Sequence, residues 1–277
     1  MPRRTALLES HVVSSEPGAD LKHMDEYVSY LATLTANRQI FLLNFHANFH
    51  AFETMFRALQ TAWARLGTER DRPGRSQVGL LPFANILARH TLVGFEHLTY
   101  YQSFLAWLAF RPGLEAFLMI GKFVEDPANA DIWKNRQSDW KSYKKTFSGS
   151  ALESKSLAQS AAYRQILTHL NGEFIHPNPD FAYRDAAQKN NGKSVLLEIQ
   201  CFDGDPDIHE GHLLAYLNLL DLVVVGSENL VTNLCGPPVA ASTRETYSKQ
   251  QFNRAKQLAT KNGVSKKVME ELGNWKV

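Results

Sequence analysis

The sequence predicts a mainly α-helical protein, a multi-helix bundle with a small inserted β-hairpin. Apolar residues recur at helical spacing along most of the chain. One stretch, residues 181–202, instead alternates like paired strands around the turn signal Asn190-Asn191-Gly192. The length of 277 residues is enough to bury a substantial core in one compact unit.

Composition sets limits on the class of protein. The 30 Lys and Arg residues nearly balance the 28 Asp and Glu residues, so overall charge neither requires nor excludes a nucleic-acid partner. Cys201 and Cys235 do not form a CxxC pair, which argues against a disulfide framework or a zinc ribbon. The N-terminus lacks the apolar run of a secretion signal, and residues 213–225 are too short to span a bilayer. We therefore expect a cytoplasmic protein with no membrane partner.

The first part of the chain predicts a tail followed by a helix. Residues 1–20 show no periodicity and are expected to form a mobile tail, whereas residues 22–66 have helical spacing. The second half of this helix carries an apolar stripe that is typical of a core. The stripe consists of Phe41, Phe45, Phe49, Phe52, Phe56, Leu59, Trp63 and Leu66. Residues 67–82 are rich in Gly, Arg and Pro and predict a loop.

The central element is the longest apolar segment, residues 83–125. Its spacing predicts one helix as far as Leu108, with a kink or a second helix at Arg111-Pro112, where proline removes a backbone donor. Arg111 and Glu115 lie one turn apart among apolar residues, so we expect a partly buried ion pair. Removing Glu115 would then cost ~3 kcal/mol of stability.

The next segment predicts a helix from Asp126-Pro127 to about residue 147, since this dipeptide combines a cap with a first-turn proline. Trp133, Trp140 and Phe147 are expected to pack inward. The neighbouring row faces water in this interpretation and contains Lys134, Lys141 and Lys145. The alternative for this row is a phosphate-binding strip.

The remaining elements follow from turn and cap signals. A helix over residues 153–175 is ended by Pro177 and Pro179, and the hairpin strands are expected at residues 181–186 and 195–202. Asp205-Pro206-Asp207 caps the next helix, which runs to about residue 234. The bundle therefore covers residues 21–240, with a C-terminal helical extension over residues 241–277.

Two groups of polar residues have the spacing of metal ligands. His46, His50 and Glu53 lie on one helix face, with His90 and His97 as ligands that other elements could add. This row lies beside the apolar stripe, so a solvated or partner-facing row is favoured, and we expect neither a metal nor another cofactor. The acidic run 203–207 opens like a calcium loop, but the loop's required Gly and Glu are absent, so a turn and a helix cap explain it.

Residues 163–177 carry a further pattern, in which Arg164 precedes His169 and Asn171 precedes His176, each by five positions. The stretch resembles the HEPN superfamily, helical bundles that include RNA-cleaving toxins and carry an Arg, four to six residues, and then a His late in a helix. Arg164 and His169 match that spacing. His176, which ends its helix before a proline, matches the placement, with Asn171 where the family has Arg. Arg111-x3-Glu115 also resembles an uncharacterised branch of this superfamily.

The resemblance implies RNA as partner, a homodimer, and a role in defence or stress. A His would act as general base or acid towards the ribose 2′-hydroxyl, and an Arg would stabilise the phosphorane. The candidate catalytic residues are His176, Asn171, Arg111, Glu115, Arg164 and His169. Because Asn171 lacks a positive charge, we expect weak or absent metal-independent ribonuclease activity. Two alternatives stay open: a non-enzymatic helical protein-interaction module and a metal-binding helical bundle.

Overall fold

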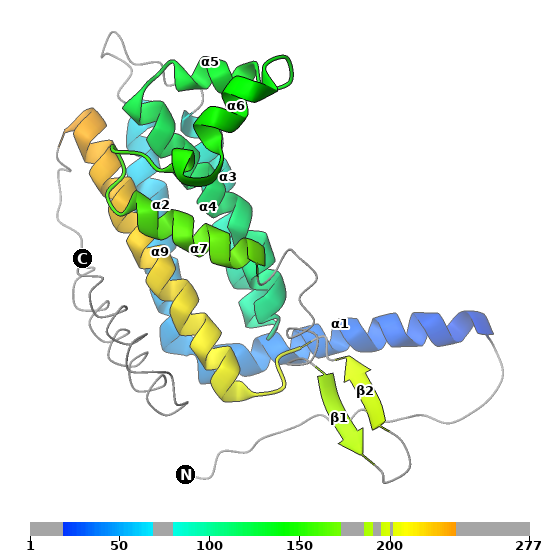
Figure 1. The fold of residues 1–277 in the computed structure, drawn as a ribbon. Coiled ribbons are helices and arrows are strands. Elements are labelled where there is room, and N and C mark those ends of the chain that lie inside the picture. The colour runs from blue at the N-terminus through cyan, green and yellow to red at the C-terminus, as the bar shows by residue number, and fades with distance from the viewer. Residues whose placement is uncertain (1–18, 69–79, 173–185, 191–194, 200–201, 237–277) are drawn as a thin grey trace, which may run out of the picture.

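A computed structural model describes residues 19–68, 80–172, 186–190, 195–199 and 202–236 of the chain. The described residues form a mainly α-helical bundle, as the sequence predicts (Figure 1). Its helices are α1 (Ala19–Asn44), α2 (His46–Thr68), α3 (Leu80–Thr99), α4 (Ser103–Glu125), α5 (Asn129–Lys134), α6 (Trp140–Phe147), the 3-10 helix η1 (Gly149–Leu152), α7 (Ser160–Leu170) and α9 (Pro206–Cys235). Of the predicted tail over residues 1–20, the first eighteen residues lie outside the described residues, as does the predicted extension at residues 241–277, whereas residues 19 and 20 begin α1.

Two short strands, β1 (Ala186–Asn190) and β2 (Val195–Ile199), pair in antiparallel register. The pairing places Ala186 opposite Ile199 and Asn190 opposite Val195. β2 begins where the second strand was expected. β1 begins at the last residue expected for the first strand, and residues 181–185 lie outside the described part of the chain.

The predicted single helix over residues 22–66 is two helices that meet at Phe45. Backbone hydrogen bonds from Phe45 N to Phe41 O (2.8 Å) and from Phe49 N to Phe45 O (2.9 Å) continue across the junction, so the chain bends without losing them. α2 runs within the bundle, whereas the N-terminal part of α1 projects away from it (Figure 1). The bend lets Phe41 and Phe45 pack around His209 of α9 with ring centroids 6.1 and 5.7 Å from it.

The predicted helix through Leu108 is also wrong, because the chain turns back at residues 100–102. Tyr101 adopts a left-handed conformation (φ 60°), and α4 then folds against α3 as a helical hairpin. The second helix expected at Arg111-Pro112 does not begin there, since Pro112 lies inside a continuous α4, and the alternative of a kink stays a prediction. Packing decides this outcome: the turn at Tyr101 buries the apolar faces of both helices against each other, and Pro112 forfeits one backbone hydrogen bond.

Glycine permits the close approach of α3 and α4. A Cβ on Gly94 would lie 2.9 Å from Ala106 O of α4 and 2.6 Å from the Tyr216 hydroxyl of α9. Both distances are shorter than side-chain carbons tolerate, so only glycine fits here without a shift in a neighbouring helix.

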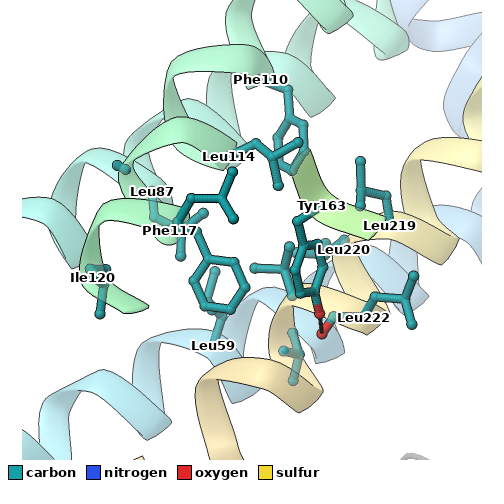
Figure 2. Packing of buried hydrophobic residues seen from close by; sticks show 14 of the residues in the cluster. Leu59, Leu87, Phe110, Leu114, Phe117, Ile120, Tyr163, Leu219, Leu220 and Leu222 are labelled. Carbon is teal, nitrogen blue, oxygen red and sulfur yellow. Dashed lines mark hydrogen bonds between the residues drawn. The ribbon is translucent and has the colours of Figure 1, made fainter. Parts of the chain in front are cut away.

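The core lies where α4 meets α2, α7 and α9. Figure 2 shows Phe117 and Leu114 of α4 facing the side chains of α2 and α9, with Tyr163 of α7 among them. The Tyr163 hydroxyl donates to Leu222 O at 2.7 Å, which satisfies its polar end inside an apolar cluster. Burial raises the pKa of Tyr163 well above its usual value, and the nearby carboxylate of Asp221 adds to this.

The segment between α4 and α7 differs from its prediction. The expected helix from Asp126 to residue 147 is two short helices, α5 and α6, separated by a turn. Phe147 is buried and Trp133 packs on Phe83 with ring centroids 5.1 Å apart, but Trp140 is 61% exposed. The predicted inward position of Trp140 is therefore wrong, because the turn at residues 135–139 breaks the seven-residue repeat.

The helix expected over residues 153–175 begins later, at Ser160, and α7 ends at Leu170. α9 matches its prediction: it begins at Pro206, and Asp205 caps it by accepting a 2.9 Å hydrogen bond from Asp207 N. By length and composition α4 and α9 could cross a membrane, and α9 is a longer stretch than the residues 213–225 considered in the sequence. In the bundle 61% and 67% of their most apolar stretches are buried, as in core helices.

Candidate functional site

A polar cluster joins α4 to the end of α7. Arg111 donates from Nε to Asn171 Oδ1 at 2.6 Å, and its Nη1 lies 3.2 Å from Glu115 Oε2. The side chains of Arg111 and Glu115 are 27% and 32% exposed, so solvent still reaches both. We call Arg111, Glu115 and Asn171 the Arg111 cluster.

Local structure explains how the three side chains meet. Because α4 continues through Pro112, Arg111 and Glu115 keep the i, i+4 spacing that places them on one face of the helix. Asn171 follows the last residue of α7 as its C-terminal cap. α7 packs on α4, and this contact brings Asn171 to the arginine from sixty positions away.

The Arg111 cluster has limited capacity for an anion. A guanidinium carries five N–H donors, and among the described residues Arg111 uses donors towards two partners. The remaining donors suit the oxygen atoms of a phosphate group. Glu115 neutralises part of the positive charge, so the cluster can orient a phosphate better than it can attract one.

Arg164 and His169, two further predicted site residues, do not join this cluster. Arg164 forms an ion pair with Glu153, donating from Nε to Oε1. His169 is exposed on α7. His176 lies outside the described residues, so its predicted role stays a prediction. Of the six candidates, the structure brings together Arg111, Glu115 and Asn171.

The predicted histidine row lies on the exposed side of α2. His50 Nδ1 is 3.7 Å from Glu53 Oε2, and these side chains are 75% and 48% exposed. His46 is exposed as well. Across the part of the chain that the structure describes, no three His, Cys, Asp or Glu side chains are grouped to hold a metal ion. The expectation that the protein carries no metal stays a prediction for elemental analysis.

His90 and His97, considered above as further ligands, are instead bound to protein groups. His90 Nδ1 lies 2.6 Å from Ala109 O, and His97 Nδ1 lies 3.0 Å from Gln102 Oε1. Both contacts run from α3 to the turn or helix that follows it. These histidines therefore hold the α3–α4 hairpin together.

A second polar cluster is buried where α9 meets the α3–α4 turn. Asp203 Oδ2 accepts a 2.6 Å hydrogen bond from Ser103 Oγ and lies 2.7 Å from His209 Nδ1. Ser103 N also lies 3.3 Å from both carboxylate oxygens, so Asp203 caps α4 from a hundred positions away. Asp203 N in turn donates to Tyr101 O at 2.7 Å. We call Ser103, Asp203 and His209 the Asp203 cluster.

The Asp203 cluster contains Ser, His and Asp, but it lacks the geometry of a hydrolase triad. In a triad the serine and the aspartate use different nitrogens of the histidine. Here Ser103 Oγ lies 3.4 Å from His209 Nδ1, the same nitrogen that faces Asp203. The other nitrogen, Nε2, is buried and has no hydrogen-bond partner among the described residues. The hydrogen bonds of this cluster therefore hold the start of α9 against the α3–α4 turn.

An aromatic ring of the α3–α4 turn also packs on this cluster. The Tyr101 ring stacks on His209 with centroids 4.1 Å apart, and His209 is fully buried. Burial raises the pKa of the Tyr101 hydroxyl, a hydrogen bond with Asn44 opposes this, and the Asp203 carboxylate adds to the rise.

Sequence reasoning missed the Asp203 cluster. It assigned residues 203–207 to a turn and a cap, which holds for Asp205 but leaves out the second role of Asp203. The available signal was Gln102-Ser103, two polar residues inside the longest apolar segment. That signal marks the turn, yet nothing in the spacing connects it to Asp203.

Within the described residues, the fold and these clusters define a helical-bundle protein with a half-buried polar cluster at Arg111 and a buried one at Asp203. Comparisons with protein-family models, curated proteins and solved structures find no match to this chain.

Proposed function

We propose that this chain is a HEPN-like RNA-binding protein whose Arg111 cluster contacts the phosphate backbone, with weak or absent cleavage. The observation that carries the proposal is the 2.6 Å hydrogen bond between Arg111 Nε and Asn171 Oδ1. Asn171 stands where the HEPN pattern has Arg, five residues before His176. Arg111 brings a positive charge from another helix to that position.

In the proposed mechanism, phosphate binding and proton transfer would fall to different residues. Arg111 would bind a phosphate oxygen and stabilise charge that develops on it, while Asn171 would hold the guanidinium in place. His176 would serve as the general base or acid if cleavage takes place. The pairing with Glu115 supports the expectation of weak activity, because it reduces the charge available to the phosphate.

Fluorescence anisotropy with labelled single-stranded RNA tests the proposal. Arg111→Gln should weaken binding by about tenfold, because a charge-assisted hydrogen bond is lost. Arg89→Gln is the matched control: it removes the same charge from an exposed site on α3 and should change affinity by less than about twofold. Equal effects from the two variants would overturn the proposal.

Asn171→Asp distinguishes an RNA-binding role of Arg111 from a purely structural contact. A carboxylate beside Arg111 strengthens the pairing within the protein, so the variant should keep its stability but bind RNA more weakly than the wild type. In a cleavage assay any activity should be lost in His176→Ala and largely kept in His169→Ala. RNA cleavage that survives His176→Ala would move the site to Arg164 and His169.

A second candidate is a non-enzymatic protein-interaction module, and the projecting α1 favours it. Large apolar side chains on α1 are exposed in the described structure: Tyr27 (62%), Val28 (58%), Leu31 (43%), Leu42 (37%) and Leu43 (84%). Mass photometry would show whether a second copy uses this face. A dimer that dissociates in Leu43→Ser, with no RNA binding by the wild type, would favour this candidate.

A further inference from the structure

An open hollow of about 900 Å³ lies at the C-terminal end of α4, beyond the Arg111 cluster along the helix. Five segments line it: the last turns of α4, Ile132 of α5, one face of α6, residues 151–157 and the start of α7. α6 presents Ser142, Lys145 and Thr146, which share a face because they are three and four positions apart. The hollow has the size of a site for a nucleotide-sized molecule.

The two carboxylates in the lining are already paired. Glu125 Oε2 lies 3.3 Å from Lys122 Nζ and accepts a 3.3 Å hydrogen bond from Lys155 N. Burial opposes ionisation of Glu125, but hydrogen bonds with Ser154 and Lys122 outweigh it and lower its pKa. Glu153 is paired with Arg164. Neither carboxylate is left to neutralise another lysine.

Consequently, two lysines of the lining have no carboxylate partner among the described residues. Lys145 and Lys155 are exposed, and neither forms an ion pair with any residue that the structure describes. Their ammonium groups supply three donors each and no acceptor. Together with Arg164, which pairs with Glu153 from outside the lining, the three lysines of the lining face two carboxylates, and this leaves an excess of two positive charges.

Hydroxyl groups add further donors to the same hollow. Ser160 Oγ accepts a 2.7 Å hydrogen bond from Ser154 N, which leaves its own O–H to donate. Thr146 is half-buried in the lining. Ammonium and hydroxyl donors around an excess of positive charge are the chemistry that binds phosphate.

We propose that this hollow binds the phosphate group of a small phosphate monoester. A monoester phosphate carries a charge of about −1.5 to −2 at pH 7, which matches the two uncompensated lysines. A phosphodiester of RNA carries one charge per phosphate and extends along a groove, so it matches the charge and the volume less well. The site is separate from the Arg111 cluster and does not depend on the function proposed above.

Isothermal titration calorimetry with ribose 5-phosphate tests the proposal on the full chain. Lys145→Gln and Lys155→Gln should each weaken binding by about tenfold, because each removes a charge-assisted hydrogen bond. Lys144→Gln is the matched control, since Lys144 is the exposed neighbour of Lys145 and does not line the hollow. It should change the Kd by less than about twofold. Circular dichroism spectra of the three variants should be unchanged because these side chains are exposed.

Two further experiments distinguish a phosphate monoester from a diester and this hollow from the Arg111 cluster. Dimethyl phosphate, a singly charged diester, should bind much more weakly than ribose 5-phosphate. Arg111→Gln should leave ribose 5-phosphate binding unchanged, which separates this site from the RNA proposal. The inference is overturned if ribose 5-phosphate does not bind, or if Lys144→Gln weakens it as much as Lys145→Gln does. It is also overturned if Lys145→Gln weakens only RNA binding, which would assign these lysines to an RNA path.

Discussion

Arg111 Nε donates a 2.6 Å hydrogen bond to Asn171 Oδ1 and so connects α4 to the end of α7. The contact gives Arg111 a partner that its own helix does not supply. Glu115, its neighbour one turn later, is therefore not the only group that holds the guanidinium. This arrangement changes what the ion pair contributes to stability.

We expect Glu115→Ala to lower the free energy of unfolding by about 1 kcal/mol, because the pair is solvent-accessible and Arg111 keeps its bond to Asn171. This is less than the ~3 kcal/mol expected for a desolvated pair. Urea denaturation measures the change, and Glu96→Ala, which disrupts an exposed pair 3.7 Å long with Arg38, is the control. A loss of 3 kcal/mol or more would show that the pair is desolvated in solution.

Gly94→Ala should destabilise the protein by roughly 1–3 kcal/mol, because the new methyl group meets Ala106 O and the Tyr216 hydroxyl. Gly211→Ala is the matched control in α9, where an added Cβ meets nothing within 4 Å. It should stabilise the protein by about 0.5–1 kcal/mol, since alanine favours a helix more than glycine does. Thermal unfolding of both variants compares them, and a stable Gly94→Ala variant would contradict the close approach of α3 and α4.

Asp203→Ala should cost about 2–3 kcal/mol, because it leaves His209 buried without its partner and removes the cap of α4. Ser103→Ala removes one hydrogen bond and should cost about 1 kcal/mol. Chemical denaturation checks both values. If Ser103 were instead a nucleophile, Ser103→Ala would abolish hydrolysis of p-nitrophenyl acetate while leaving stability intact, and this result would contradict the structural role.

Stability should fall as the pH rises above about 10, the value at which a tyrosine ionises in the unfolded chain. Burial raises the pKa of Tyr163 and of Tyr216, so both stay neutral in the folded protein while the unfolded chain loses protons. The contribution is fully present below pH 10 and is lost above it. Denaturation at pH 8, 10 and 11 measures the slope, which should decrease in Tyr163→Phe. An unchanged slope would show that Tyr163 does not titrate on unfolding.

The sequence by itself determined the features that depend on neighbouring residues. Helical spacing of apolar residues determined the mainly α-helical class, and the pair Arg111 and Glu115 followed from i, i+4 spacing. The start of α9 followed from the cap at Asp205. Each of these involves residues within one helical turn, and such contacts are fixed once a helix forms.

Only the tertiary structure decided the turn at Tyr101, the contact of Arg111 with Asn171 and the burial of His209 beside Asp203. Apolar burial is not directional, so periodicity states which face of a helix is buried but not which helix covers it. The left-handed Tyr101 is held by packing and by the bond from Asp203 N, which lies about a hundred positions further along the chain. The hollow beside Lys145 likewise arises where five segments meet, and no local pattern encodes that meeting.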